Sequence, residues 1–261
     1  MSQVIAFTNS KGGTGKSTLC ANLAHTVAET GARVLLIDLT PQVTCTSLFL
    51  GGDMEAEETI VAALKKKPEK HLEDLVRESD KGLDVVPAHT TMADAVLHLS
   101  TIQLGKEGVL KREIERVRSQ YDYIFIDSPG DLNELTVNAM VPATKILIPT
   151  RINRTDFSCT ETTVKFIRDA EELIGPRTVR VVVNMLDPRY LPNGSWHNSH
   201  AGRLYHQAQE TFNGSLCAIA IPDSSDVRTA FDRGQTVGEY RRQSVVAQRI
   251  RELAQCEVLG E

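Results

Sequence analysis

A glycine-rich loop near the N-terminus constrains the fold of this chain more than any other feature. Residues 10–18 read S-K-G-G-T-G-K-S-T and lie between a short apolar run, 3–8, and a helix-like stretch, 17–30. A strand, a glycine loop and a helix in this order are the context in which such a loop binds phosphate. Ser10 replaces the first glycine of the general pattern G-x-x-x-x-G-K-[ST], but K-G-G-x-G-K-[ST] fits at every position.

The residue types in this loop predict how it binds a nucleotide. Glycines let backbone N–H groups approach phosphate oxygens, and the N-terminus of the following helix favours negative charge. We expect Lys16 to reach the β- and γ-phosphates and Ser17 to hold Mg²⁺. Lys11 lies five positions before Lys16, where its backbone does not aim it at the same γ-phosphate, and a lysine placed there can serve the nucleotide of a neighbouring molecule. The predicted nucleotide-binding residues of the loop are Lys11, Gly12, Gly13, Thr14, Gly15, Lys16, Ser17 and Thr18.

Apolar runs that alternate with helical patterns predict an α/β fold. Several runs, such as 34–37, are continuously apolar, which is typical of parallel strands covered by helices on both faces. We therefore expect one domain over residues 1–261, with a doubly wound, mainly parallel sheet. The candidate strands are 3–8, 33–38, 83–87, 121–127, 145–149, 179–184 and 218–221. The candidate helices are 17–30, 106–120, 132–140, 156–174, 202–212 and 244–254.

Two segments do not follow this alternation. Residues 55–81 carry dense charge of both signs, which indicates a solvated helical surface or a partner contact. Residues 186–201 contain prolines, a glycine and Trp196, and they read as a long loop. Trp196 either folds back over its own loop or anchors a partner.

Composition excludes several classes of protein. No run of about 18 apolar residues occurs and no basic-then-apolar leader is present, so we expect a cytoplasmic protein with no membrane span. The five cysteines form no C-x-x-C pair and are odd in number, which favours reduced thiols. A formal charge of −5 argues against extensive nucleic-acid coating but allows a local basic face.

Two aspartates follow predicted strands at the edge where doubly wound sheets bind ligands. Asp127 ends the run 121–127, and we expect it to hold Mg²⁺ through a water molecule. Asp38 ends the run 33–38, and we expect it to contribute to metal binding and catalysis. Either aspartate could instead cap a helix or be a hydrogen-bonded strand-end carboxylate.

These segments together resemble one family. K-G-G-T-G-K-S-T at 11–18, V-L-L-I-D-L-T-P-Q at 34–42 and Y-D-Y-I-F-I-D-S-P at 121–129 are similar to the ParA/MinD family of deviant Walker-box ATPases. The match continues through L-T-V-N-A-M at 135–140 and reaches Ile221-Pro222, so it covers nearly the whole chain. Among subfamilies, the ParA-type partition proteins are most similar.

The resemblance implies an ATP- and Mg²⁺-dependent sandwich homodimer in which Lys11 crosses to the γ-phosphate of the other subunit. Lys11 and Lys16 are then catalytic, because a cation supplied in trans accelerates phosphoryl transfer. It also implies non-specific DNA binding, nucleoid association, and a ParB-like or other adaptor that stimulates hydrolysis. Such a cycle positions plasmids, chromosomes or other large cargo.

The resemblance also places further contacts. Adenine recognition falls on Asn184, Pro222 and Asp223, although an asparagine at a strand end is also an ordinary turn residue. For DNA, the C-terminal arginines are candidates, with a solvated mixed-charge surface as the alternative. The predicted DNA-binding residues are Arg228, Arg233, Arg241 and Arg242.

Two departures from the family pattern bear on activity. Thr40 stands where the family has a second aspartate, and a hydroxyl is a far poorer base, so we expect slow hydrolysis. Gly130-Asp131 stands where partition proteins commonly have Pro-Ser. A nucleotide-gated adaptor with negligible hydrolysis is therefore an alternative. A MinD-like membrane-associated regulator is a further alternative, although such proteins end in a basic amphipathic helix and this sequence ends in an acidic, weakly apolar stretch. An iron–sulfur reductase would need paired cysteines, and no close pair stands out.

Overall fold

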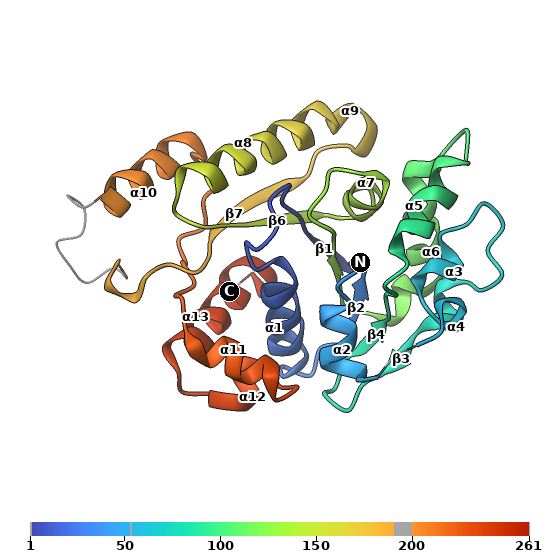
Figure 1. The fold of residues 1–261 in the computed structure, drawn as a ribbon, viewed down its shortest axis with the longest axis horizontal. Coiled ribbons are helices and arrows are strands. Elements are labelled where there is room, and N and C mark those ends of the chain that lie inside the picture. Colours follow the sequence, from blue (N-terminus) through green and yellow to red (C-terminus); the bar gives the residue numbers. More distant parts are fainter. Residues whose placement is uncertain (1, 53, 191–199, 261) are drawn as a thin grey trace.

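The structure is a computed structural model that describes residues 2–52, 54–190 and 200–260. Its described strands form one seven-stranded sheet in the order β3-β4-β2-β5-β1-β6-β7 (Figure 1). Every neighbouring pair is parallel except β3 and β4, which are antiparallel. The strands are β1 Gln3–Phe7, β2 Val34–Asp38, β3 Arg77–Glu78, β4 Asp84–Val86, β5 Tyr123–Asp127, β6 Lys145–Thr150 and β7 Thr178–Val183. The predicted α/β class and mainly parallel sheet are confirmed.

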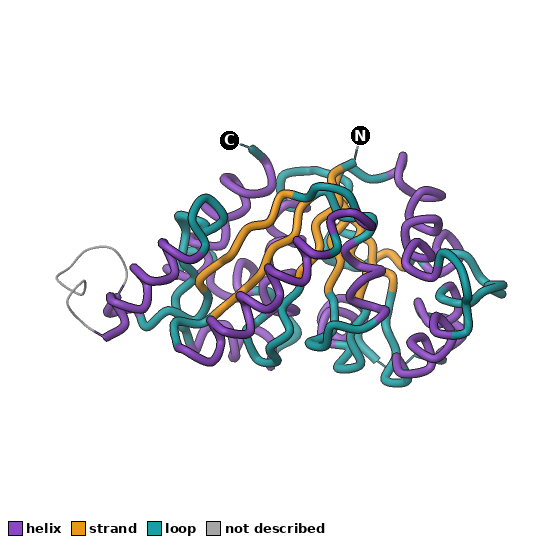
Figure 2. Tube along the Cα trace, turned by 90° about the horizontal axis from the view of Figure 1, so that it is seen from above, coloured by secondary structure: helices purple, strands orange, loops and turns teal. Residues whose placement is uncertain are grey.

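Helices cover both faces of this sheet, as Figures 1 and 2 show. One face packs against α1, α2 and α11–α13, and the other packs against helices between α3 and α10. The longer helices are α1 Lys16–Ala28, α5 Met92–Ser100, α6 Val109–Val117, α8 Arg154–Asp169, α10 His200–Thr211, α11 Ser225–Asp232 and α13 Val245–Ala254. The shorter ones are α2 Thr44–Leu50, α3 Ile60–Ala63, α4 Leu72–Leu75, α7 Glu134–Met140, α9 Glu171–Ile174 and α12 Val237–Arg241.

The central strand β1 shows why its sequence is apolar throughout. Val4 and Ala6 belong to one hydrophobic core, and Ile5 and Phe7 belong to the other. Successive side chains of a strand point to opposite faces, so a strand covered on both sides needs no polar position. The ring of Phe7 stacks on that of Phe125 in the neighbouring strand, with centroids 6.2 Å apart. This packing fixes the end of β1, from which the phosphate loop emerges.

One predicted strand is wrong. Residues 218–221 form no strand, although Cys217 N–H donates to Val181 O at 2.8 Å and Ile221 N–H donates to Val183 O at 2.9 Å. Between these two bonds the segment advances four residues, from 217 to 221, while β7 advances two, from 181 to 183. The extra residues bulge away from β7, so a regular ladder of hydrogen bonds cannot form. Beyond the bulge, Pro222 forms only an isolated parallel bridge with Leu186.

Several other segments differ from their predictions. The charged side chains of residues 55–81 are exposed or half-buried, as a solvated surface requires. The segment is helical only in part, because it forms the short helices α3 and α4 and the edge strand β3, and the apolar side chains of both helices are buried. The helices α2, α5, α11 and α12 were not predicted; each is shorter than the window of about 11–18 residues over which helical periodicity is read. In the predicted loop 186–201, Pro188–Tyr190 forms a 3₁₀ turn. Trp196 lies outside the described residues. No helix in the described ranges has the length and apolar character of a membrane span.

Candidate nucleotide-binding site

The strand order brings three loops together at the carboxyl edge of the sheet. The phosphate loop (residues 10–18) follows β1, the first switch loop (39–43) follows β2, and the second switch loop (128–133) follows β5. They enclose a cavity of about 520 Å³. Its lining residues are Ser10, Gly12, Gly13, Gly15, Lys16, Ser17, Thr18, Thr40, Gln42, Thr44, Ser128, Pro129, Gly130 and Asp131.

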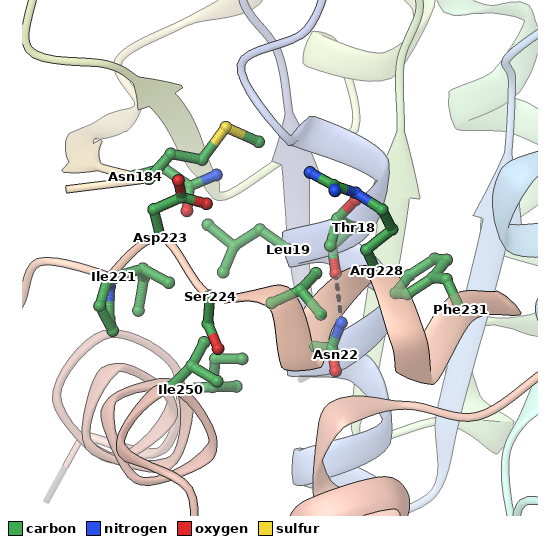
Figure 3. A pocket seen from close by; sticks show the side chains of 14 residues that line it. Thr18, Leu19, Asn22, Asn184, Ile221, Asp223, Ser224, Arg228, Phe231 and Ile250 are labelled. Atoms are coloured by element: carbon green, nitrogen blue, oxygen red, sulfur yellow. Dashed lines mark hydrogen bonds between the residues drawn. The ribbon is translucent and has the colours of Figure 1, made fainter. Parts of the chain in front are cut away.

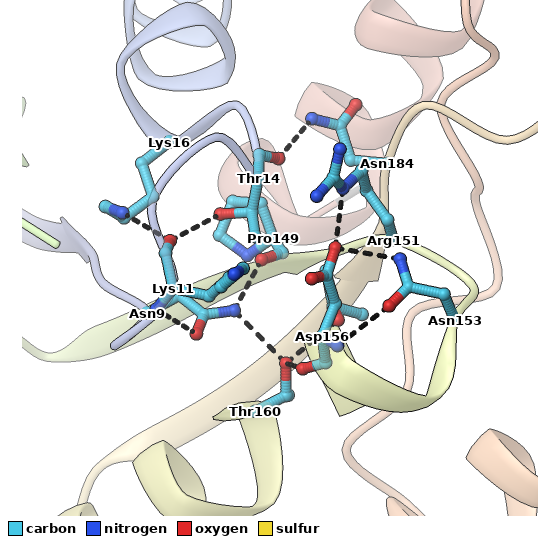
Figure 4. A network of polar contacts seen from close by, with 11 residues as sticks. Asn9, Lys11, Thr14, Lys16, Pro149, Arg151, Asn153, Asp156, Thr160 and Asn184 are labelled. Carbon is cyan, nitrogen blue, oxygen red and sulfur yellow. Dashed lines mark hydrogen bonds and ion pairs between the residues drawn. The ribbon is translucent and has the colours of Figure 1, made fainter. Parts of the chain in front are cut away.

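Asn9 anchors the start of the phosphate loop, a role that the sequence reasoning missed. Its side-chain amide donates to Pro149 O at 2.8 Å and to Thr160 Oγ1 at 3.1 Å, and its carbonyl oxygen accepts from Lys11 N–H at 3.1 Å (Figure 4). The next residue is held as well, since Ser10 N–H donates to Thr163 Oγ1 at 3.0 Å. The sequence signal that could have identified Asn9 is its position between a buried strand and the glycine loop. The loop is thus fixed to β6 and α8 before it reaches its glycines.

Glycine is required at two points of the loop. Gly13 and Gly15 have φ of 74° and 86°, which side-chain-bearing residues rarely adopt. A Cβ at Gly15 would also lie 2.3 Å from Asn184 Nδ2. That amide donates to Thr14 O at 2.8 Å, so Asn184 at the end of β7 holds the loop from the opposite side.

The two lysines of the loop lie differently. Lys16 Nζ donates to Lys11 O at 3.0 Å, inside the curve of its own loop, and Lys16 is buried. Burial lowers the pKa of the Lys16 ammonium, while Asp127 and Asp131 act in the opposite direction. Figure 4 shows the Lys11 side chain extending away from the ammonium of Lys16. Of the two lysines, Lys16 lines the cavity, and its ammonium is held there by a hydrogen bond within its own loop.

Asp127 fits the predicted magnesium site. It is completely buried, and its Oδ1 has no hydrogen-bond partner among the described residues. Its Oδ2 accepts a weak bond from Cys45 Sγ at 3.6 Å, and the Ser17 hydroxyl also acts to lower the pKa of Asp127. Burial, aided by the nearby charge of Asp38, raises the pKa of Asp127 to about 8. A buried carboxylate oxygen without a partner, beside the Ser17 hydroxyl, suits a hard cation such as Mg²⁺.

Asp38 has a different environment. Its Oδ1 accepts from Thr40 N–H at 2.9 Å and Thr40 Oγ1 at 2.8 Å, and its Oδ2 accepts from Thr46 N–H at 3.0 Å and Thr46 Oγ1 at 2.9 Å. Asp38 is fully buried, is not among the residues that line the cavity, and burial raises its pKa against these four bonds. The predicted metal-binding and catalytic roles of Asp38 remain predictions. This geometry favours the alternative, a hydrogen-bonded strand-end carboxylate.

A second cavity, of about 330 Å³, adjoins the phosphate cavity through Thr18 (Figure 3). Asn184, Pro222 and Asp223 line it, which brings together the three residues predicted to contact adenine. The remaining lining is largely apolar, as a flat base requires. Arg228 also lines this cavity, so the structure brings one predicted DNA-binding arginine to the nucleotide side of α11.

The other three predicted DNA-binding arginines do not form a purely basic face. Arg241 pairs with Asp226 at 3.3 Å, and Arg242 pairs with Glu29 at 3.4 Å. The Arg233 guanidinium lies 5.1 Å from the centre of the Tyr240 ring. The Arg241 and Arg242 side chains are 66% and 67% exposed, so both remain accessible to a partner.

Comparison with known proteins agrees with this geometry. Residues 2–177 match the family model described as an AAA domain. The chromosome partitioning protein ParA of Caulobacter vibrioides is 31% identical over 249 residues, which cover 91% of this chain and 87% of that protein. The sporulation initiation inhibitor protein Soj of Bacillus subtilis is 38% identical over 149 residues, which cover 57% of this chain and only 58% of Soj.

A solved structure shows the same fold. The septum site-determining protein MinD of Pyrococcus horikoshii, in complex with Mg-ADP, superposes with a TM-score of 0.77 at 22% identity, over 99% of this chain and 97% of MinD. The family model covers more than half of the chain, and the similarity to ParA covers nearly all of it. The chain therefore belongs to the ParA/MinD family of deviant Walker-box ATPases and is close to the ParA-type partition proteins.

Proposed function

We propose that this protein is an ATP-dependent dimerising ATPase that binds DNA without sequence preference and positions a plasmid, a chromosome or other large cargo. The observation that supports this best is the divergence of the two loop lysines (Figure 4). Lys16 serves its own site, whereas Lys11 is free to approach a nucleotide bound by a second copy. A cation supplied in trans accelerates phosphoryl transfer by about 10³–10⁵.

ATP and Mg²⁺ fit the two adjoining cavities. The phosphates occupy the larger one, and the base enters the smaller one beside Asn184, Pro222 and Asp223. Asn184 uses one amide hydrogen on Thr14 O, which leaves its other hydrogen and its oxygen for a base edge. Ser17 and Asp127 hold the Mg²⁺, which neutralises charge on the phosphates when bound.

Light scattering tests the dimer proposal directly. We expect a dimer with ATP and a monomer with ADP or without nucleotide. Lys11→Ala should bind ATP normally but stay monomeric and inactive, whereas Lys16→Ala should lose ATP binding. A Lys11→Ala protein that dimerises and hydrolyses ATP like the wild type would contradict the role in trans.

DNA binding is proposed for the exposed arginines at the end of α12. Binding should require ATP and weaken steeply between two salt concentrations, because phosphate contacts release counterions. Replacing Arg241 and Arg242 together by alanine should reduce the salt slope by about 2, at about 1 for each lost contact. Arg189→Ala is the matched control, since Arg189 is 79% exposed and also paired with an aspartate. Binding that ignores salt or nucleotide would contradict the proposal.

An adaptor that binds nucleotide but barely hydrolyses it is a second candidate, favoured by one observation. The Thr40 hydroxyl donates to Asp38 and is buried, so it is poorly placed to act on water. Turnover with DNA separates the two candidates, and Thr40→Asp should raise a rate that Thr40 limits. An unchanged rate would remove Thr40 as the cause. In either case a ParB-like or other adaptor is the proposed partner, and nucleoid association follows from DNA binding.

A further inference from the structure

Asp131 is the one acidic residue among the described residues that line the phosphate cavity. Asp38 and Asp127 are fully buried behind that lining, and Asp38 already has four hydrogen-bond donors. The Asp131 side chain is exposed and makes no hydrogen bond or ion pair with any described residue. A carboxylate with open acceptor sites thus faces a cavity that otherwise suits an anion.

The second switch loop holds Asp131 in a defined place. At its start, Ser128 Oγ donates to Phe7 O at 2.7 Å. At its end, Thr136 Oγ1 donates to the backbone oxygen of Asp131 at 2.5 Å, and Thr136 is fully buried. Between these anchors the loop passes close to the phosphate-binding lysine, since a Cβ at Gly130 would lie 3.6 Å from Lys16 Nζ. Asp131 is therefore near the position of a γ-phosphate without being bonded to Lys16.

We propose that Asp131 positions the attacking water and accepts its proton, in place of the aspartate that Thr40 replaces. This inference rests on the proposed ATP hydrolysis. A carboxylate is a far stronger proton acceptor than a hydroxyl, and general-base assistance contributes typically about 10²–10⁴ to a rate. The two switch loops line the same cavity, so a carboxylate on either loop can reach water at the γ-phosphate.

The step balances with groups already named. The water oxygen forms a bond to the γ-phosphorus while the bond from that phosphorus to the β–γ bridging oxygen breaks, and its electron pair leaves with ADP. The water proton passes to the Asp131 carboxylate and then to solvent. The products are ADP, inorganic phosphate and one proton.

Asp131→Asn tests the proposal, because it keeps the shape of the side chain and removes its basicity. In the 261-residue chain with DNA, we expect kcat to fall at least tenfold while the Kd for ATP is unchanged or tighter. The affinity for ADP with aluminium fluoride, which mimics the transition state, should fall at least tenfold, and the affinity for ADP alone should not. Asp131→Glu should recover part of both losses.

Glu134→Gln is the matched control, since Glu134 begins α7 beside the same loop and pairs with Lys106 away from the cavity lining. It should change neither readout. An Asp131→Asn protein with unchanged kcat and tighter ATP binding would overturn the proposal and make Asp131 only a counter-charge for Lys16. Wild-type protein that binds ATP but shows no turnover would overturn the proposed hydrolysis first, and this inference with it.

Discussion

Replacement of Asp38 by asparagine separates a structural role of this residue from a catalytic one. The carboxylate accepts four hydrogen bonds, two from Thr40 and two from Thr46, in a fully buried position. Asparagine has nearly the same shape but replaces one acceptor oxygen by an NH₂ donor. Each oxygen of Asp38 accepts two of the four bonds, so in the asparagine variant two of the threonine donors would face the NH₂ group, which is itself a donor. Thr46 Oγ1 already accepts from Ala88 N–H at 2.9 Å, so it cannot easily reverse its role.

The size of the effect follows from these contacts. The amide is best accommodated with its NH₂ toward Thr40, whose hydroxyl can turn to accept, and this leaves the buried Thr40 N–H unpaired. An unpaired buried donor costs about 1–3 kcal/mol, and the remaining bonds lose the assistance of a charge. Removing the buried charge offsets part of this loss of stability, because burial disfavours the ionised carboxylate and raises the pKa of Asp38. We therefore expect the free energy of unfolding to fall by about 2–4 kcal/mol.

Urea unfolding at neutral pH, with the slope m fitted for each variant, measures this change. The control is Asp122→Asn, which also removes an acceptor of several bonds, those from Arg33, but at an exposed site where much less stability should be lost. ATP affinity should fall with Asp38→Asn, because the first switch loop loosens. Wild-type stability together with abolished turnover would refute the reasoning and return Asp38 to a role in the chemistry.

Three further predictions concern the same site. Gly15→Ala should lower the free energy of unfolding in urea by about 2–4 kcal/mol, because the new Cβ meets Asn184. Gly13→Ala has open space around its Cβ and should lower it by about 1 kcal/mol, for the positive φ alone. Equal losses in the two variants would contradict the contact with Asn184. Asn9→Ala should weaken ATP binding measured by calorimetry, since the loop loses three anchoring bonds, and an unchanged affinity would argue against that anchor. Asp127 has its pKa raised from 3.8 to about 8, so without bound metal its contribution to stability is full below about pH 4, falls as pH rises, and is gone above about pH 8. Melting temperatures of magnesium-free protein should show this decline between pH 5 and 8, and a decline that persists in Asp127→Asn would assign it to another group.

The sequence predicts every strand of the described sheet except the short edge strand β3. The runs that became β1, β2, β5 and β6 have continuously apolar centres because helices cover both of their faces, whereas Arg180 interrupts the apolar run of β7. Strand β3 has only two residues, Arg77 and Glu78, and pairing at an edge leaves no periodic signature in so short a segment. Residues 218–221 have a strand-like composition, but their spacing against β7 is set by the fold, which no local pattern reveals.

The candidate site likewise has residues that the sequence predicts and contacts that it does not. The phosphate loop and Asp127 could be predicted because their residue types follow a strand directly. The second role of Asn184 could not, since its bond to Thr14 joins residues 170 positions apart. The four bonds to Asp38 were equally hidden, because a strand-end aspartate reads the same in sequence whether it faces a ligand or a pair of threonines.

The register of the sheet gives a physical reason why a carboxylate is easier to keep on the second switch loop than on the first. Asp127 pairs with Phe7 on one side and with Asp38 on the other, so two buried carboxylates already lie at the same level of adjacent strands. The charge of Asp38 disfavours ionisation of Asp127, and burial raises the pKa of both. A third carboxylate at the buried position 40 would join this cluster, where Thr40 now donates two bonds to Asp38. Asp131 instead lies at an exposed position, where water solvates its charge, and still faces the same cavity.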